Sequence, residues 1–164
     1  MRRVADILLA VLSFVLGLVV PKDRGLLVAG GRQFGGNTRP LLERAGHHGL
    51  RVLWLTGRHE ILALGRPDVV STRSWRGLWA AARAGGVALT HSLGDFSPLR
   101  FPSRRTRLWN LWHGMPIKRI STADPAFHQR RHARTNLREM RRYDAMFVTS
   151  DAMADIFRRT FGLG

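Results

Sequence analysis

The chain has 164 residues, 45% of them hydrophobic, and it contains no cysteine. This composition argues against disorder and excludes a disulfide framework or a thiolate metal site, and the length suits one domain better than two. The formal net charge of +16 comes almost wholly from arginine, since Lys22 and Lys118 are the only lysines. Such a charge predicts attraction to polyanions, whether nucleic acid, anionic lipid or a phosphate-rich polymer.

The first predicted element is an apolar helix from Val4 to Val20, interrupted only by Asp6 and Ser13. At about 1.5 Å per residue its length is roughly 25 Å, the lower limit for crossing a bilayer. Positive residues flank it on both sides, which gives no orientation and suits a segment dipping into one leaflet. We interpret residues 1–21 as a membrane-associating helix that is not a cleaved signal peptide; a core helix is the alternative.

After Pro21 the sequence alternates short apolar strands with helices. The predicted strands are Gly25–Gly30, Leu50–Gly57, Asp68–Thr72, Val87–Ser92, Arg107–Gly114 and Asp144–Ser150. The predicted helices cover about 39–46, 74–85 with Ser74 as N-cap, 125–142, and 151–162 with Asp151 near its start. This alternation predicts an α/β fold over residues 22–164, a Rossmann-like, doubly wound and mostly parallel sheet.

Ligands of open parallel sheets collect at the carboxyl edge, where strands end and loops begin. Four features are expected there, namely the Gly-rich turn after the first strand, His91–Ser92, the loop Gly94–Arg105, and His113–Lys118. Their convergence predicts a functional site at this edge.

The Gly-rich turn "GGRQFGGN" ends at Asn37 and resembles a dinucleotide fingerprint. It misses the required spacing, and no acidic residue closes the second strand. The glycines either form a tight strand-to-helix turn or let backbone N–H groups approach an anion. Asn37 is accordingly either a helix cap or a polar ligand group.

The stretch "LWNLWHGMPIKRI", Leu108–Ile120, holds the best catalytic candidates. His113 is followed by Gly114, which frees the backbone to turn, and by Pro116, which blocks a helix. A neutral imidazole takes a proton from an attacking hydroxyl, and Lys118 holds a phosphate as a point charge. The pair suits attack on a phosphoryl group, with a purely structural histidine as the alternative.

The other side chains of note carry weaker signals. Trp109 and Trp112 alternate with their neighbours as in a strand, so one or both are expected in the core. The basic stretch Phe127–Arg142 indicates a solvated face or a contact with anions, and no nucleic-acid reader motif accompanies it. No metal site is expected, because histidines and carboxylates lack ligand spacing such as HExxH.

The segment "LWHGMPIK" resembles the Trp-His-Gly-x-Pro-hydrophobic-Lys motif of the CDP-glycerol glycerophosphotransferase family, the polymerases and primases of wall teichoic acid and related poly(glycerol phosphate) chains. Four further stretches resemble that family in the same order: "PKDRGLLVAG", "FGGNTRPLLERA", "RVLWLTG" and "YDAMFVTSDAMADIFRRTFG". Two departures are Met115, where the family often has threonine, and the loop Gly94–Arg105, which has no counterpart.

The resemblance implies a GT-B-type architecture of two Rossmann-like domains with the active site between them. This chain corresponds to the N-terminal, acceptor-side half, so a C-terminal domain or a partner chain is expected to supply the donor site. Carried over, His113 is the catalytic base that deprotonates the acceptor hydroxyl. Asn37, Trp112, Gly114 and Lys118 are the expected substrate-binding residues.

The implied function is transfer of glycerol phosphate from the donor substrate CDP-glycerol to a membrane lipid-linked acceptor, without a cofactor, in teichoic acid or related cell-wall polymer synthesis. We expect the chain to be inactive alone. The expected partners are the lipid-linked acceptor and the anionic membrane surface, not nucleic acid, with a peripheral or monotopic location on the cytoplasmic face of the cell membrane. The rival functions are a non-catalytic module that binds anionic lipid or phosphate-rich polymer, and a nucleic-acid-binding protein.

Overall fold

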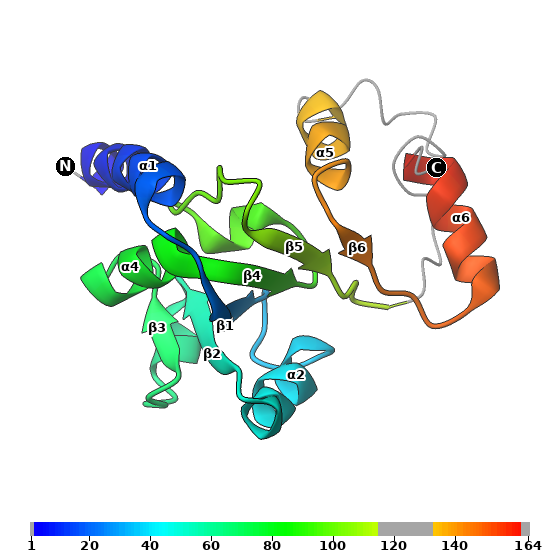
Figure 1. Cartoon of the computed structure of the whole chain (residues 1–164), viewed down its shortest axis with the longest axis horizontal. Helices are drawn as coiled ribbons and strands as arrows, with labels where there is room; N and C mark the ends of the chain where they lie inside the picture. Colours follow the sequence, from blue (N-terminus) through cyan, green and yellow to red (C-terminus); the bar gives the residue numbers. More distant parts are fainter. Residues whose placement is uncertain (1, 115–132, 162–164) are drawn as a thin grey trace.

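A computed structural model describes residues 2–114 and 133–161 of the chain. Six strands, all paired in parallel, form one sheet in the order β3-β2-β1-β4-β5-β6 (Figure 1). The strands are β1 (Asp23–Gly30), β2 (Arg51–Thr56), β3 (Val69–Ser71), β4 (Ala84–Leu89), β5 (Arg107–Asn110) and β6 (Ala145–Met146). The strand order reverses between β1 and β4, which is where a doubly wound sheet opens its ligand crevice.

The predicted helices are present with small shifts at their ends. They are α1 (Arg2–Val19), α2 (Thr38–Ala45), α4 (Trp75–Arg83), α5 (Ala133–Met140) and α6 (Asp151–Phe161). Residues 125–132 of the predicted fourth helix lie outside the described residues. The sequence did not indicate the short helices α3 (His59–Leu62), η1 (Gly46–His48) and η2 (Leu93–Phe96).

Helices cover both faces of the sheet, as the doubly wound class requires. On one face α4 and α1 pack on strand residues such as Val28 and Val87, with Leu78 of α4 in the same cluster. On the other face, Leu42 of α2 packs with Ala29 and Trp54. The predicted Rossmann-like α/β class is therefore confirmed.

Strand β5 is shorter than the sequence indicated, because it ends at Asn110 rather than at Gly114. The Asn110 side-chain oxygen accepts a hydrogen bond from the backbone N–H of Trp112, 2.8 Å away. Trp112 then adopts a left-handed backbone conformation with φ of 53°. A local side-chain bond of this kind competes with continued strand pairing and turns the chain.

One face of α1 packs against the domain. Ser13 and Gly17 are buried on this face, and Leu9 and Leu16 pack against the main hydrophobic cluster. The Ser13 hydroxyl accepts a hydrogen bond from the backbone N–H of Arg100 at 3.0 Å. These contacts agree with the core-helix alternative for this face.

The opposite face of α1 is apolar and exposed. Its exposed large side chains are Val4, Ile7, Leu8, Val11, Leu12, Phe14, Val15, Leu18 and Val19. Within residues 2–114 and 133–161, no helix has both the length and the apolar character needed to cross a membrane. A contiguous exposed apolar surface indicates a contact with a membrane or a partner, so a membrane-associating segment at residues 1–21 stays a prediction.

Both ends of α4 are capped by side chains. The Ser74 hydroxyl accepts a hydrogen bond from the backbone N–H of Gly77 at 3.0 Å, which confirms the predicted N-cap. At the other end, the Lys22 ammonium donates to the backbone oxygen of Ala82. The lysine thereby satisfies one of the carbonyl groups that the end of a helix leaves without a partner.

The N-cap gives a test of the fold. Ser74→Ala is expected to lower the free energy of unfolding by about 1 kcal/mol, because the Gly77 N–H loses its acceptor. Ser74→Asp, which keeps an acceptor at the same position, should retain most of that stability. Denaturant unfolding of the three proteins measures the difference, and equal losses in both variants would contradict the capping role.

Candidate functional site at the carboxyl edge of the sheet

Three loops meet beyond the carboxyl ends of β1, β4 and β5. They enclose a cavity of about 410 Å³ lined by Arg32, Gln33, Gly35, Gly36, Asn37, Thr90, His91 and His113. Its volume lies within the range typical of small-ligand sites. The structure therefore brings together three of the four features that the sequence predicts at this edge.

The conformation of Trp112 positions the site. Its φ of 53° is unusual for a bulky side chain. Such a backbone costs on the order of 1–3 kcal/mol, so it persists only where its surroundings hold it. Asn110 binds the Trp112 N–H, as described above. From the other side, the Asn37 amide donates to the backbone oxygens of Leu111 at 2.9 Å and Trp112 at 3.1 Å. Two asparagines thus hold the turn that presents His113.

The imidazole of His113 is exposed, and its Nδ1 lies 2.9 Å from the backbone oxygen of Thr90. A carbonyl oxygen only accepts, so in the neutral ring Nδ1 carries the proton and donates to Thr90. The Nε2 atom then holds the free lone pair, and it has no hydrogen-bond partner among the described residues. This tautomer is the one that a general base needs.

His91 stacks on His113. The ring centroids are 4.3 Å apart and the ring planes differ by 8°. The Nδ1 atom of His91 lies 2.9 Å from the Thr90 hydroxyl and 4.0 Å from the Asp95 carboxylate. Burial lowers the pKa of His91, the neighbouring His113 lowers it further, and Asp95 opposes them only in part. His91 is therefore held neutral beside the candidate base.

Asn37 and Trp112 have structural contacts that the sequence did not reveal. Asn37 occupies the N-cap position of α2 but makes no capping bond, because its amide binds the Trp112 turn. The Trp112 ring is only 8% exposed, and its centroid lies 4.6 Å from that of Phe157 on α6. Asn37, Trp112, His113 and Gly114 also line a second, smaller cavity of about 160 Å³. Their roles in substrate binding stay predictions.

The remaining predicted features fall in different places. Lys118 lies outside the described residues. In the loop Gly94–Arg105, the Asp95 carboxylate faces His91, but Leu99 is buried in the core. Most of this loop therefore supports the fold rather than the cavity.

The Gly-rich turn is shaped by close packing at its start and by open space at its end. A Cβ atom on Gly31 would lie 2.8 Å from the Thr90 hydroxyl oxygen, so a side chain there would displace the Thr90 side chain. At Gly35 and Gly36 a Cβ atom would meet nothing within 4 Å. The backbone near Asn37 therefore borders the cavity and leaves room for a ligand.

Sequence reasoning missed two polar groups of the site. Arg32 is exposed and has no ion-pair partner in the described part of the chain, so its guanidinium is available to an anion. Nothing in the sequence distinguishes it from the many other arginines. Asp95 follows His91 by four residues, and one Asp95 oxygen is buried without a hydrogen-bond partner among the described residues. The four-residue spacing between His91 and Asp95 was the sequence signal that could have identified Asp95.

Comparisons with known proteins agree with the fold. Residues 12–164 match the family model of CDP-Glycerol:Poly(glycerophosphate) glycerophosphotransferase. A structure of the wall teichoic acid polymerase TagF, a histidine-to-asparagine variant soaked with CDPG for 30 minutes, superposes with a TM-score of 0.72 at 15% identity. That match covers 87% of this chain and 38% of the TagF chain. No curated protein matches the chain.

Two further TagF structures give the same result. TagF itself matches with a TM-score of 0.66 at 18% identity over 87% of this chain and 37% of its own. The histidine-to-asparagine variant after a 15-minute soak matches with a TM-score of 0.72 at 14% identity, over 99% of this chain and 45% of the TagF chain. At such identities the likeness shows the fold, a GT-B-like one. This chain spans less than half the length of these structures.

The fold and site define a Rossmann-like domain of the GT-B-like class. Because the family model matches nearly the whole chain, the chain belongs to the CDP-Glycerol:Poly(glycerophosphate) glycerophosphotransferase family. The expected family membership is therefore confirmed.

The stacked histidines give a pH-dependent test. His91 is expected to titrate below the ordinary histidine pKa of about 6.5, and His113→Gln should raise the His91 pKa in part, because one of the groups that lower it is removed while burial remains. Since the unfolded chain binds this proton more readily, the His91 contribution to stability should fall as the pH drops below about 6.5. Imidazole NMR signals followed against pH measure the shift, with His48→Gln as the control. An unchanged His91 pKa in His113→Gln would contradict the coupling.

Proposed function

We propose that this chain forms the acceptor side of a glycerophosphotransferase that moves glycerol phosphate from CDP-glycerol to a lipid-linked acceptor. The observation that carries the proposal is the free Nε2 of His113, whose tautomer is set by the Thr90 carbonyl at the mouth of the cavity. The family membership supplies the reaction class.

In the proposed reaction His113 acts as the general base. The acceptor hydroxyl gives its proton to Nε2 while its oxygen attacks the phosphorus that carries glycerol. A new P–O bond forms, the anhydride bond to the second phosphate breaks, and cytidine monophosphate leaves. Positioning and neutralisation of charge do most of the work in phosphoryl transfer.

Neighbouring groups suit this step. Arg32 offers a cation to a phosphate in the cavity. His91 stacks on His113, and burial together with its neighbours lowers the pKa of His91, which favours its neutral form. Asn37 fixes the backbone that carries His113. Lys118 stays a candidate for phosphate binding on sequence grounds alone.

The donor site is proposed to need more protein than these residues provide. The chain spans 37–45% of the TagF structures that it resembles, and in a GT-B architecture the active site lies between two domains. We therefore expect that residues 1–164 alone do not turn over CDP-glycerol. A C-terminal domain or a partner chain would complete the site.

Turnover tests the catalytic assignment. In a complete enzyme, His113→Ala should lower the transfer rate by about a hundredfold or more, because the acceptor proton loses its base. Incorporation of labelled glycerol from CDP-glycerol into a lipid-linked acceptor measures the rate. His48→Ala, at an exposed histidine of η1, is the matched control and should retain activity. Full activity in His113→Ala would refute the assignment, and robust turnover by these 164 residues alone would refute the need for a second domain.

We also propose that the exposed face of α1 attaches the domain to the cytoplasmic surface of the membrane. Nine large apolar side chains of this helix are exposed, among them Leu8, Val11 and Val15. A helix that buries such a face at the headgroup boundary binds by apolar area, assisted by attraction of basic groups to anionic lipid. The net charge of +16 supplies that attraction.

Vesicle binding tests the attachment. Val11→Asp/Val15→Asp is expected to weaken binding to anionic vesicles by about tenfold or more, because two apolar side chains that contact the bilayer in this proposal become charged. Leu64→Asp/Ile156→Asp, which changes equally exposed apolar residues elsewhere by the same charge, is the control. Co-sedimentation with vesicles gives the affinity. Equal losses in both pairs would show that net charge, not the α1 face, determines binding.

The second candidate function is a non-catalytic module that binds anionic lipid or a phosphate-rich polymer. The surplus of arginine favours it. It differs from the transferase in one respect, since it predicts that His113→Ala leaves function intact.

A further inference from the structure

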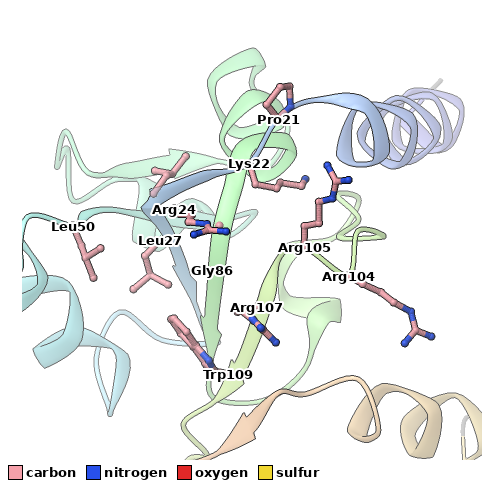
Figure 2. Close-up of a pocket in the computed structure, with 12 residues that line it drawn as sticks. Pro21, Lys22, Arg24, Leu27, Leu50, Gly86, Arg104, Arg105, Arg107 and Trp109 are labelled. Carbon is pink, nitrogen blue, oxygen red and sulfur yellow. The ribbon is translucent and has the colours of Figure 1, made fainter.

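A second large cavity lies at the amino edge of the sheet, opposite the His113 site. It has a volume of about 830 Å³ and forms where β1, β4 and β5 begin. Figure 2 shows its lining, which consists of Pro21, Lys22, Arg24, Leu26, Leu27, Leu50, Gly85, Gly86, Arg104, Arg105, Arg107 and Trp109. We call it the amino-edge pocket.

The rim of the amino-edge pocket is cationic. Five of the lining residues are lysine or arginine, and none is a carboxylate. Arg107 has a partner, the Asp144 carboxylate at 2.6 Å. Arg24, Arg104 and Arg105 make no ion pair within the ranges that the structure describes. Like charges gathered around one cavity repel one another, and an anion bound among them would relieve that repulsion.

The floor of the pocket is apolar and has an aromatic wall. Trp109 of β5 lies across Gly86 of β4, where a Cβ atom would be 3.0 Å from the indole ring. Leu27 of β1 borders the same spot, 3.1 Å from that Cβ position. Glycine at this position therefore leaves room for the indole ring beside Leu27. The pocket combines unpaired cations with an apolar surface, which suits an anionic ligand that also has a non-polar body.

This pocket is separate from the candidate active site. All strands run in parallel, so the starts of β4 and β5 face away from His91 and His113 at the other edge. The two cavities have no lining residue in common. A ligand in the amino-edge pocket would not touch the reacting groups.

We propose that the amino-edge pocket binds the phosphate group of a phosphate ester, with Arg24 and Arg105 on the anion and the ligand body on Trp109. The favoured source is a glycerophospholipid headgroup, for which we rely on the proposed membrane attachment. The pocket begins at Pro21, just after α1 ends at Val19, a residue that is 68% exposed at the end of the apolar face. Arginine matches phosphate geometry through two parallel N–H donors.

Charge-matched variants of the intact chain test this proposal. Arg24→Gln/Arg105→Gln removes two rim cations without touching His113. Arg44→Gln/Arg159→Gln removes two exposed arginines of α2 and α6 that have no ion-pair partner among the described residues. One arm titrates glycerol 3-phosphate in solution by calorimetry. The other arm compares binding of the protein to phosphatidylcholine vesicles with and without phosphatidylglycerol, and the difference is the contribution of the anionic headgroup.

The pocket pair is expected to weaken phosphate binding by about tenfold or more and the control pair by less than about twofold. Loss in both arms supports a lipid headgroup. Loss for glycerol 3-phosphate alone supports the phosphate site with a soluble ligand as its source. Equal losses for the two pairs, or no binding of either probe by the unaltered chain, would overturn the proposal. Retained α/β circular dichroism in each variant shows that the fold is intact, and retained turnover in a complete enzyme separates failure of this site from failure of the catalytic one.

Discussion

The candidate site depends on the left-handed turn at Trp112. Without it, β5 would continue outward and His113 would project away from the neighbouring strand. Because Asn110 ends the strand and Asn37 holds the carbonyl groups of the turn, the backbone is fixed at Trp112 and the His113 Nδ1 atom reaches the backbone oxygen of Thr90. The aromatic packing of Trp112 on Phe157 then anchors the turn to α6. A strained backbone is retained here because contacts from both sides determine it.

The contact between His91 and His113 links structure to chemistry. Two stacked imidazoles cannot both be protonated without strong repulsion, and the partly buried ring of His91 is the less favourable place for a charge. The proton on Nδ1 of His113 is fixed by the Thr90 carbonyl, which leaves Nε2 for the substrate side. One main-chain carbonyl and one neighbouring ring therefore set both the tautomer and the charge environment of the candidate base.

The parallel sheet gives the molecule two chemically different edges. Histidine, asparagine and threonine gather at the carboxyl edge, where the loops after β1, β4 and β5 converge. Arginine and lysine gather around the amino-edge pocket, close to the end of α1. The helix itself has two apolar faces. One packs on the core through Leu9 and Leu16, and the other remains exposed.

The amino-acid sequence by itself determined the elements and their class. Apolar runs of strand length, the Ser74 cap and the helix signals after each strand are local patterns, so they predicted the sheet and its helices. It also singled out His113, because a histidine between tryptophan and glycine at a strand end is a local feature. Tertiary structure alone decided the rest. Asn37 binds carbonyl groups more than 70 positions away, and His113 meets Thr90 across 23 positions. Such contacts depend on strand order and on a backbone turn that local propensity does not encode. The same holds for the amino-edge pocket, whose cations come from the starts of two strands, β1 and β5, that are far apart in the sequence.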